Sequence, residues 1–197
     1  MLKSVKKKSK SKGITSRFKD VGRDNNFKNS SILLTTEDIY TQTLSKLNKV
    51  ASIPKMGEHH HIVTQNAINS FDFIIGILAK EKIKNLYIAF YRIGKKVVTE
   101  LNDLIEKNHI QKIHLLINDG FPKLVPDCWN LIKQLESDNF TVRVENNHTK
   151  IILIETDENF YVIEGSGNLS INARIEQYIF MNNKEVYDFH KRWIEKI

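Results

Sequence analysis

The fold of this chain is decided by residues 148–170, which read HTKIILIETDENFYVIEGSGNLS. Two runs of strand length, His148–Glu155 and Asn159–Glu164, are rich in the branched and aromatic residues that favour β-structure. A polar turn at Thr156–Asn159 joins them, so the stretch predicts a β-hairpin. The second strand ends in Gly165-Ser166-Gly167-Asn168, a tight loop expected near the start of the first strand.

Polar groups gather where this hairpin begins and ends. Residues two apart on a strand project to the same face, so we expect the His148 imidazole and the Lys150 ammonium to point the same way. The glycine loop adds backbone amides, the Ser166 hydroxyl and the Asn168 amide. A nucleophile or acid, a cation and neutral donors together suit a phosphate oxyanion. They do not suit a metal ion, because no carboxylate cluster accompanies them, and no Ser-His-Asp triad is readable at a known spacing.

These residues resemble the HKD motif of the phospholipase D superfamily. His148-x-Lys150-x4-Glu155 is followed by Gly165-Ser166-x-Asn168-Leu169-Ser170. Glu155 stands where family members usually have Asp, and the nine-residue spacer before the glycine is longer than usual, which a longer turn absorbs. Downstream, Glu176 stands where the family commonly has a glutamate that orients a catalytic histidine, while Arg174 replaces a frequent asparagine.

The resemblance implies a phosphodiesterase that needs neither metal nor cofactor. His148 attacks phosphorus to form a phosphohistidine, and water then releases the product. The implied site residues are His148, Lys150, Ser166, Asn168 and Glu176, with Gly165 and Gly167 in the phosphate loop and Glu155 at the structural acidic position.

The resemblance also implies two such motifs meeting across a twofold axis, and this chain has one. No other histidine is followed two residues later by lysine. We therefore expect a homodimer in which two copies of His148 complete one active site.

Working outward, predicted strands and helices alternate ahead of the motif. The expected strands are 61–64, 85–91 and 112–117, and the expected helices are 66–80, 94–108 and 126–138. The final third reads as strands 140–145, 148–155, 159–164 and 175–181, then a helix over 184–196 with Val186, Phe189, Trp193 and Ile194 as its apolar face. This rhythm predicts an α/β fold, a mixed sheet flanked by helices in α-β-α layers.

The chain is expected to have three parts. Residues 1–30 contain ten Lys or Arg and two Asp or Glu, a net charge of +8, whereas residues 31–197 carry twenty basic and twenty-one acidic residues. Few apolar residues accompany that charge, so a disordered tail is predicted, with Lys6, Lys7, Lys8, Lys10 and Lys12 available to bind nucleic acid. An anionic membrane surface or a solubilising spacer are the alternatives. Residues 31–57 form a lead-in with a helix from Thr36 to about Lys49, and 58–197 form the phospholipase D-like domain.

The chain's one cysteine, Cys128, and the lack of a signal peptide or an apolar run of spanning length predict a cytoplasmic protein without a transmembrane segment. Lysine outnumbers arginine 24 to 6, and isoleucine and asparagine are plentiful, which suggests a bacterial, phage or mobile-element genome.

Several other residues invite a functional reading. His59-His60-His61 cannot all bind one metal ion on a strand, because adjacent side chains alternate faces. Trp129, Trp193 and Cys128 are expected in the core, whereas Tyr91 or Arg92 can line the cleft.

The first functional hypothesis is a metal-independent nuclease acting on DNA or RNA. A catalytically weak nucleic-acid-binding or interaction module of a phage or defence system is the first alternative. A lipid phosphodiesterase is the second, and it is disfavoured because no amphipathic anchor rich in Trp or Phe is present.

Overall fold

The computed structural model describes residues 36–65, 67–169 and 174–196. All of them belong to one compact unit, Leu34–Ile197. The predicted tail, including its five lysines at positions 6, 7, 8, 10 and 12, lies outside the described residues.

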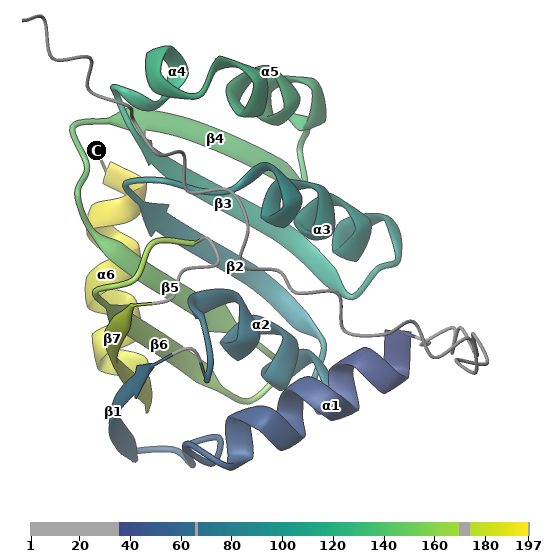
Figure 1. Ribbon diagram of the computed structural model, residues 1–197, viewed down its shortest axis with the longest axis vertical. Coiled ribbons are helices and arrows are strands. Elements are labelled where there is room, and N and C mark those ends of the chain that lie inside the picture. The colour runs from purple at the N-terminus through teal and green to yellow at the C-terminus, as the bar shows by residue number, and fades with distance from the viewer. Residues whose placement is uncertain (1–35, 66, 170–173, 197) are drawn as a thin grey trace, which may run out of the picture. The chain divides into compact units, whose positions relative to one another are not determined.

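A seven-stranded mixed sheet forms the centre of this unit (Figure 1), in the order β1-β7-β6-β5-β2-β3-β4. Strands β2, β3 and β4 are parallel to one another, and every other neighbouring pair is antiparallel. The strands are β1 (His59–Gln65), β2 (Ile83–Phe90), β3 (Ile110–Asn118), β4 (Phe140–Glu145), β5 (Lys150–Glu155), β6 (Phe160–Gly165) and β7 (Ile175–Asn182).

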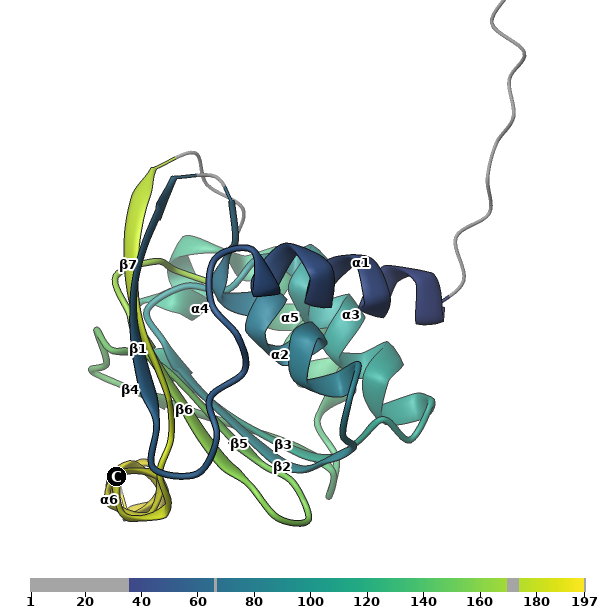
Figure 2. The same ribbon diagram turned by 90° about the horizontal axis from the view of Figure 1, so that it is seen from below.

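Helices cover both faces of the sheet, which confirms the predicted α-β-α layers. Figure 2 shows α6 on one side and the other helices on the opposite side. The helices are α1 (Thr36–Asn48), α2 (Ser70–Leu78), α3 (Lys95–Glu106), α4 (Phe121–Leu124), α5 (Pro126–Leu135) and α6 (Lys184–Lys196).

Strand β5 shows how alternation builds the two cores. Ile152 and Ile154 join the large cluster under α1, α2, α3 and α5, while Ile151 and Leu153 join the smaller cluster under α6. All four are buried. A strand covered on both faces is apolar at every position, which explains the run IILI.

The hairpin predicted from the deciding stretch is confirmed, since β5 and β6 pair antiparallel around a turn closed by the Thr156 amide and the Asn159 carbonyl at 3.0 Å. Strand β5, however, begins at Lys150, so His148 lies in the preceding loop and not on the strand. Strand β4 does not join this meander, because it pairs parallel with β3.

Two helix predictions need correction. Helix α2 begins at Ser70, later than expected, because Asn69 caps it and Asp72 completes a capping box. In α6 Phe189 is 57% exposed, and Tyr187 takes its place in the core beside Ile194. Tyr187 reaches the sheet because its hydroxyl donates to Glu155 at 3.1 Å.

The predicted lead-in helix, α1, belongs to the same compact unit as the sheet. Its Leu47 is fully buried against α2, where a Cβ on Gly76 would meet the Leu47 side chain at 2.7 Å. Of the helices in the described part of the chain, none is both long and apolar enough to cross a membrane.

Candidate active site at the head of the β5–β6 hairpin

Apart from Glu155, the predicted site residues lie at one edge of the sheet, where β5 begins and β6 ends. Because β5 is antiparallel to both β2 and β6, its first residue lies beside the last residues of those strands. Lys150 is opposite Phe90 of β2, and Ile151 is opposite Glu164 of β6. The start of β7 lies at this edge too, with Tyr178 opposite Gly165.

The structure brings His148 and Lys150 together, although by a different route from the one predicted. The Lys150 Nζ lies 3.3 Å from His148 Nδ1 and donates to the His148 backbone carbonyl at 2.9 Å. An ammonium group can only donate a hydrogen bond. In this contact Nδ1 is the acceptor. Lys150 thus contacts both the loop that carries His148 and the His148 ring.

Burial lowers the pKa of the Lys150 ammonium, and the nearby Glu176 carboxylate opposes this lowering. A desolvated cation attracts a phosphate more strongly than a hydrated one does, because less water screens it. The ammonium is therefore suited to binding an anion.

The loop that carries His148 is held by a buried asparagine that sequence reasoning missed. Asn147 is 5% exposed, and its Nδ2 donates to the carbonyls of Phe90 and Leu116, each at 3.3 Å. Its Oδ1 accepts from the amide of Thr149 at 2.9 Å and from the Thr149 hydroxyl at 2.6 Å. One side chain thus joins β2, β3 and the turn ahead of Lys150.

A second asparagine supports the first. Asn118, at the end of β3, donates through Nδ2 to the Asn147 carbonyl at 3.1 Å and accepts from the Gly120 amide at 2.8 Å. An asparagine at a strand end is the one sequence signal for such a role, and it is too common to have identified either residue.

Tyr178 explains why the predicted phosphate loop contains two glycines. A Cβ on Gly165 would lie 2.5 Å from the Tyr178 ring, and one on Gly167 would lie 2.8 Å from the Tyr178 hydroxyl. Both contacts are closer than real side chains allow. Close approach of a buried ring, more than a special backbone conformation, is therefore the reason for glycine at these positions.

Within the loop, the Ser166 hydroxyl donates a short hydrogen bond to the Glu176 carboxylate. The same oxygen accepts from the Gln177 amide at 3.1 Å. Ser166 thus links the end of β6 to the start of β7 and positions Glu176 near Lys150.

Asn168 lies in the part of the loop that packs on the β2–α3 connection. Its neighbour Leu169 donates to the Arg92 carbonyl at 3.3 Å and accepts from the Gly94 amide at 3.1 Å. The Asn168 Oδ1 is buried and has no hydrogen-bond partner among the described residues. A buried acceptor without a partner is costly, so this oxygen can accept a hydrogen bond from a ligand donor, while Nδ2 is the Asn168 group that can donate to an oxyanion.

Tyr91 completes the site from the end of β2. Its ring lies 4.8 Å from the His148 ring, between centroids, and the Lys150 Nζ lies 5.9 Å from its centroid. The Arg92 guanidinium carbon lies 5.4 Å from the same centroid. Three cationic or titratable side chains thus surround one aromatic ring.

Glu155 lies at the opposite end of β5, away from this edge. Its carboxylate accepts from Asn85 at 3.0 Å and from Tyr187 at 3.1 Å. It therefore has partners within the fold, on the side covered by α6.

The histidine triplet lies on edge strand β1. His59 and His61 share a face, with ring centroids 5.5 Å apart, and His60 is on the other. Within the described ranges, no group of three His, Cys, Asp or Glu side chains could hold a metal ion.

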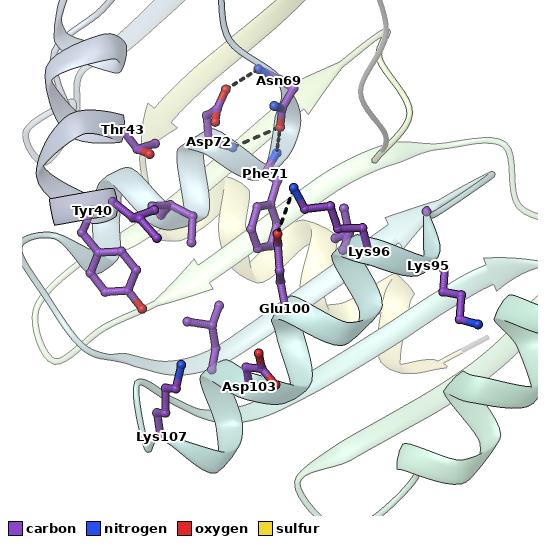
Figure 3. Close-up of a pocket in the computed structure, with 15 residues that line it drawn as sticks. Tyr40, Thr43, Asn69, Phe71, Asp72, Lys95, Lys96, Glu100, Asp103 and Lys107 are labelled. Carbon is purple, nitrogen blue, oxygen red and sulfur yellow. Dashed lines mark hydrogen bonds and ion pairs between the residues drawn. The ribbon is translucent and has the colours of Figure 1, made fainter. Parts of the chain in front are cut away.

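A cavity of about 600 Å³ lies between α1, α2 and α3 (Figure 3). Tyr40, Phe71 and Leu104 contribute to its wall, and Lys95 and Lys96 lie at the start of α3. None of the predicted catalytic side chains lines it, so it is separate from the His148 site.

No protein-family model and no curated protein sequence matches the chain. Among solved structures, polyphosphate kinase from Porphyromonas gingivalis superposes with a TM-score of 0.55 at 12% identity, covering 76% of this chain and 28% of that one. Phosphatidylserine synthase from Haemophilus influenzae Rd KW20 gives 0.47 at 14% identity over 70% and 37% of the two chains. TrmBL2, an archaeal chromatin protein, gives 0.44 at 15% identity over 81% and 59%.

The TM-scores for the synthase and for TrmBL2 are below 0.5, too low to indicate a shared fold. The chain spans between 28% and 59% of the length of these three proteins. At 12% identity the likeness to polyphosphate kinase shows the fold alone. The described part of this chain accordingly shares its fold with the matched part of that kinase.

Proposed function

We propose that the chain is a metal-independent phosphodiesterase, most simply a nuclease, with His148 as the nucleophile. The observation that carries the proposal is the 3.3 Å contact between Lys150 Nζ and His148 Nδ1, beside the tightly packed glycine loop that carries Asn168. The fold is shared with part of a protein named polyphosphate kinase, and that name supports a phosphoryl-transfer role.

In the proposed reaction an imidazole nitrogen of His148 forms a bond to phosphorus, and the ester P–O bond breaks. The leaving oxygen takes a proton from His148 of the partner subunit, so the homodimer supplies nucleophile and acid from one residue type. Water then attacks phosphorus, the P–N bond breaks, and the partner's His148 accepts the proton of the water. Lys150 and the Nδ2 amide of Asn168 donate to the non-bridging oxygens, and Ser166 holds Glu176 in place.

The acid copy of His148 must be the imidazolium, because a neutral imidazole that lost its Nε2 proton would become an imidazolate. The nucleophilic copy must instead present a nitrogen lone pair. The two copies of His148 therefore need different protonation states, which the one His148 of a monomer cannot supply at the same time.

The test incubates the purified protein with EDTA and with single-stranded DNA, plasmid, RNA or a chromogenic diester. We expect turnover that survives EDTA and is abolished in His148→Ala, whereas His61→Ala, at an exposed position on β1, retains it. Turnover that stops with EDTA while His148→Ala stays active overturns the mechanism. Binding of nucleic acid without turnover on any ester favours the interaction-module alternative, and turnover of a phospholipid alone favours the lipid one.

The homodimer has a separate test. Sedimentation equilibrium of the active protein is expected to give twice the chain mass, and a fully active monomer contradicts the shared site.

A further inference from the structure

The Tyr91–Arg92 pair lies beside the proposed site, and none of the proposed steps uses it. Arg92 is exposed, and none of the described residues forms an ion pair or a side-chain hydrogen bond with its guanidinium. Its position is nevertheless restricted. Its carbonyl accepts from the Leu169 amide at 3.3 Å, and its guanidinium lies over the Tyr91 ring.

The spacing of the cations around the Tyr91 ring is what identifies a ligand. The guanidinium carbon lies 5.4 Å and the His148 centroid 4.8 Å from one ring centroid, so the two groups are within about 10 Å of each other. Each strand of double-stranded DNA carries one charge every ~3.4 Å along the helix axis. A strand with its scissile phosphate at His148 therefore places a neighbouring phosphate within reach of Arg92.

We infer that Arg92, held on the Tyr91 ring, binds the phosphate next to the scissile one, so that the site selects single-stranded nucleic acid over isolated phosphodiesters. This inference rests on the proposed function for the identity of the scissile position. A guanidinium matches phosphate geometry with paired N–H donors. An aromatic ring interleaved with cations is also typical of surfaces that bind single strands. Tyr91 acts as a positioning residue for both His148 and Arg92.

The experiment compares a dinucleotide, which has one phosphodiester, with a trinucleotide, which has two. In the wild type we expect kcat/KM to rise about tenfold with the second phosphate, the size of one charge-assisted contact. Arg92→Gln is expected to remove most of that rise, whereas Arg192→Gln retains it. Arg192 is an exposed arginine on α6, so this control makes the same charge change on the other face of the sheet.

A binding measurement keeps the inference testable if turnover is absent. In the His148→Ala background, the affinity for a single-stranded oligonucleotide is measured against salt concentration. Arg92→Gln is expected to reduce the slope of log affinity against log salt by about 0.7, the value of one phosphate contact on a single strand. Arg192→Gln is expected to leave the slope unchanged.

The outcomes separate the two proposals. No turnover by the wild type on any ester contradicts the proposed function alone. If Arg92→Gln matches Arg192→Gln in both the substrate ratio and the salt slope, the inference is overturned while the function stands.

Tyr91→Phe keeps the ring and is expected to retain the preference for the trinucleotide, whereas Tyr91→Ala is expected to lose it. Equal loss in both Tyr91 variants would contradict the positioning role.

Discussion

At the scale of single residues, Lys150 shapes the candidate site more than any other described side chain. It contacts the His148 ring, the His148 carbonyl and the Tyr91 ring, and the charge of Glu176 acts on it. Partial burial holds the pKa of its ammonium below that of a free lysine. The protonated form is the one that binds an oxyanion, so the pKa of Lys150 sets an alkaline limit on the proposed activity.

We expect kcat/KM to fall as the pH rises through the lowered pKa of Lys150, because a neutral amine no longer attracts the phosphate. Lys150→Arg keeps the charge at high pH, so it should move this alkaline limb to higher pH even though its maximal rate falls. Lys150→Gln should lose about a hundredfold in kcat at pH values below the pKa of Lys150, where the wild-type ammonium is charged. A pH–rate profile checks both, with Lys82→Arg, at an exposed position, as the control. An alkaline limb that stays in place in Lys150→Arg would show that another group titrates.

The sequence predicted the proximity of His148 and Lys150 because their spacing, with the following hairpin, restricts where they can lie. It did not predict that His148 precedes the strand. That shift depends on Asn147, whose hydrogen bonds to Phe90 and Leu116 come from strands about 30 to 60 residues earlier in the chain. No local pattern encodes such contacts. Tyr178, the reason for both loop glycines, was likewise read only as part of a strand.

At the scale of elements, the site depends on two connections, the one into β5 and the one from β6 to β7. The first is held by Asn147, which donates to carbonyls at the ends of β2 and β3, and by Asn118, which donates to the Asn147 carbonyl. The second is held by the packing of Gly165 and Gly167 on Tyr178. Both connections are fixed by buried contacts and not by the exposed groups that the chemistry needs.

Asn147→Ala should lower the free energy of unfolding by about 2 to 3 kcal/mol, because buried groups on Phe90, Leu116 and Thr149 lose their partner. The neighbouring Asn146 is exposed, so Asn146→Ala should change the free energy of unfolding by less than about 0.5 kcal/mol. Urea denaturation measures both. Equal effects of the two variants would mean that the Asn147 hydrogen bonds do not hold the loop.

The glycine loop allows a double-mutant cycle. Gly167→Ala places a Cβ 2.8 Å from the Tyr178 hydroxyl oxygen, and Tyr178→Phe removes that oxygen. Gly167→Ala should therefore cost about 1 kcal/mol less in the Tyr178→Phe background than in the wild type. Denaturation of the four proteins gives the coupling energy. A coupling of zero would mean that contact with Glu176, 3.2 Å from the same Cβ, excludes a side chain at this position.

At the scale of the whole molecule, the alternation of strands and helices was enough to predict a mixed sheet between helical layers. It could not give the strand order, because the pairing of β2 with β5 and of β1 with β7 joins segments far apart in the sequence. The smaller core under α6 was the part predicted least well. It contains Tyr87 and Tyr187, whose hydroxyls donate to Glu195 and Glu155. A helix face that packs against the sheet through a tyrosine and a glutamate does not appear in the sequence as an apolar stripe.

This tyrosine-rich core gives the molecule an alkaline limit of stability. Burial first, and the adjacent carboxylates second, raise the pKa of Tyr87 and Tyr187, and the same causes raise that of Tyr161 beside Glu81. Their stabilising contribution is complete below the ordinary tyrosine pKa of about 10. Above it the unfolded chain releases protons that the folded protein retains, so each tyrosine should lower the free energy of unfolding by about 1.4 kcal/mol per pH unit.

Tyr187→Phe tests this limit, because the variant has one phenol fewer to release a proton on unfolding. At neutral pH it should cost about 1 kcal/mol for the lost hydrogen bond to Glu155. Its stability should then fall less steeply with pH than that of the wild type, so the gap narrows above pH ~10. Val162→Ala, in the same core, adds no titratable group and should lower stability by the same amount at every pH. Denaturation at a series of alkaline pH values gives the free energy of unfolding of each protein against pH. Parallel plots for Tyr187→Phe and the wild type would mean that Tyr187 ionises equally easily in the folded and unfolded chain.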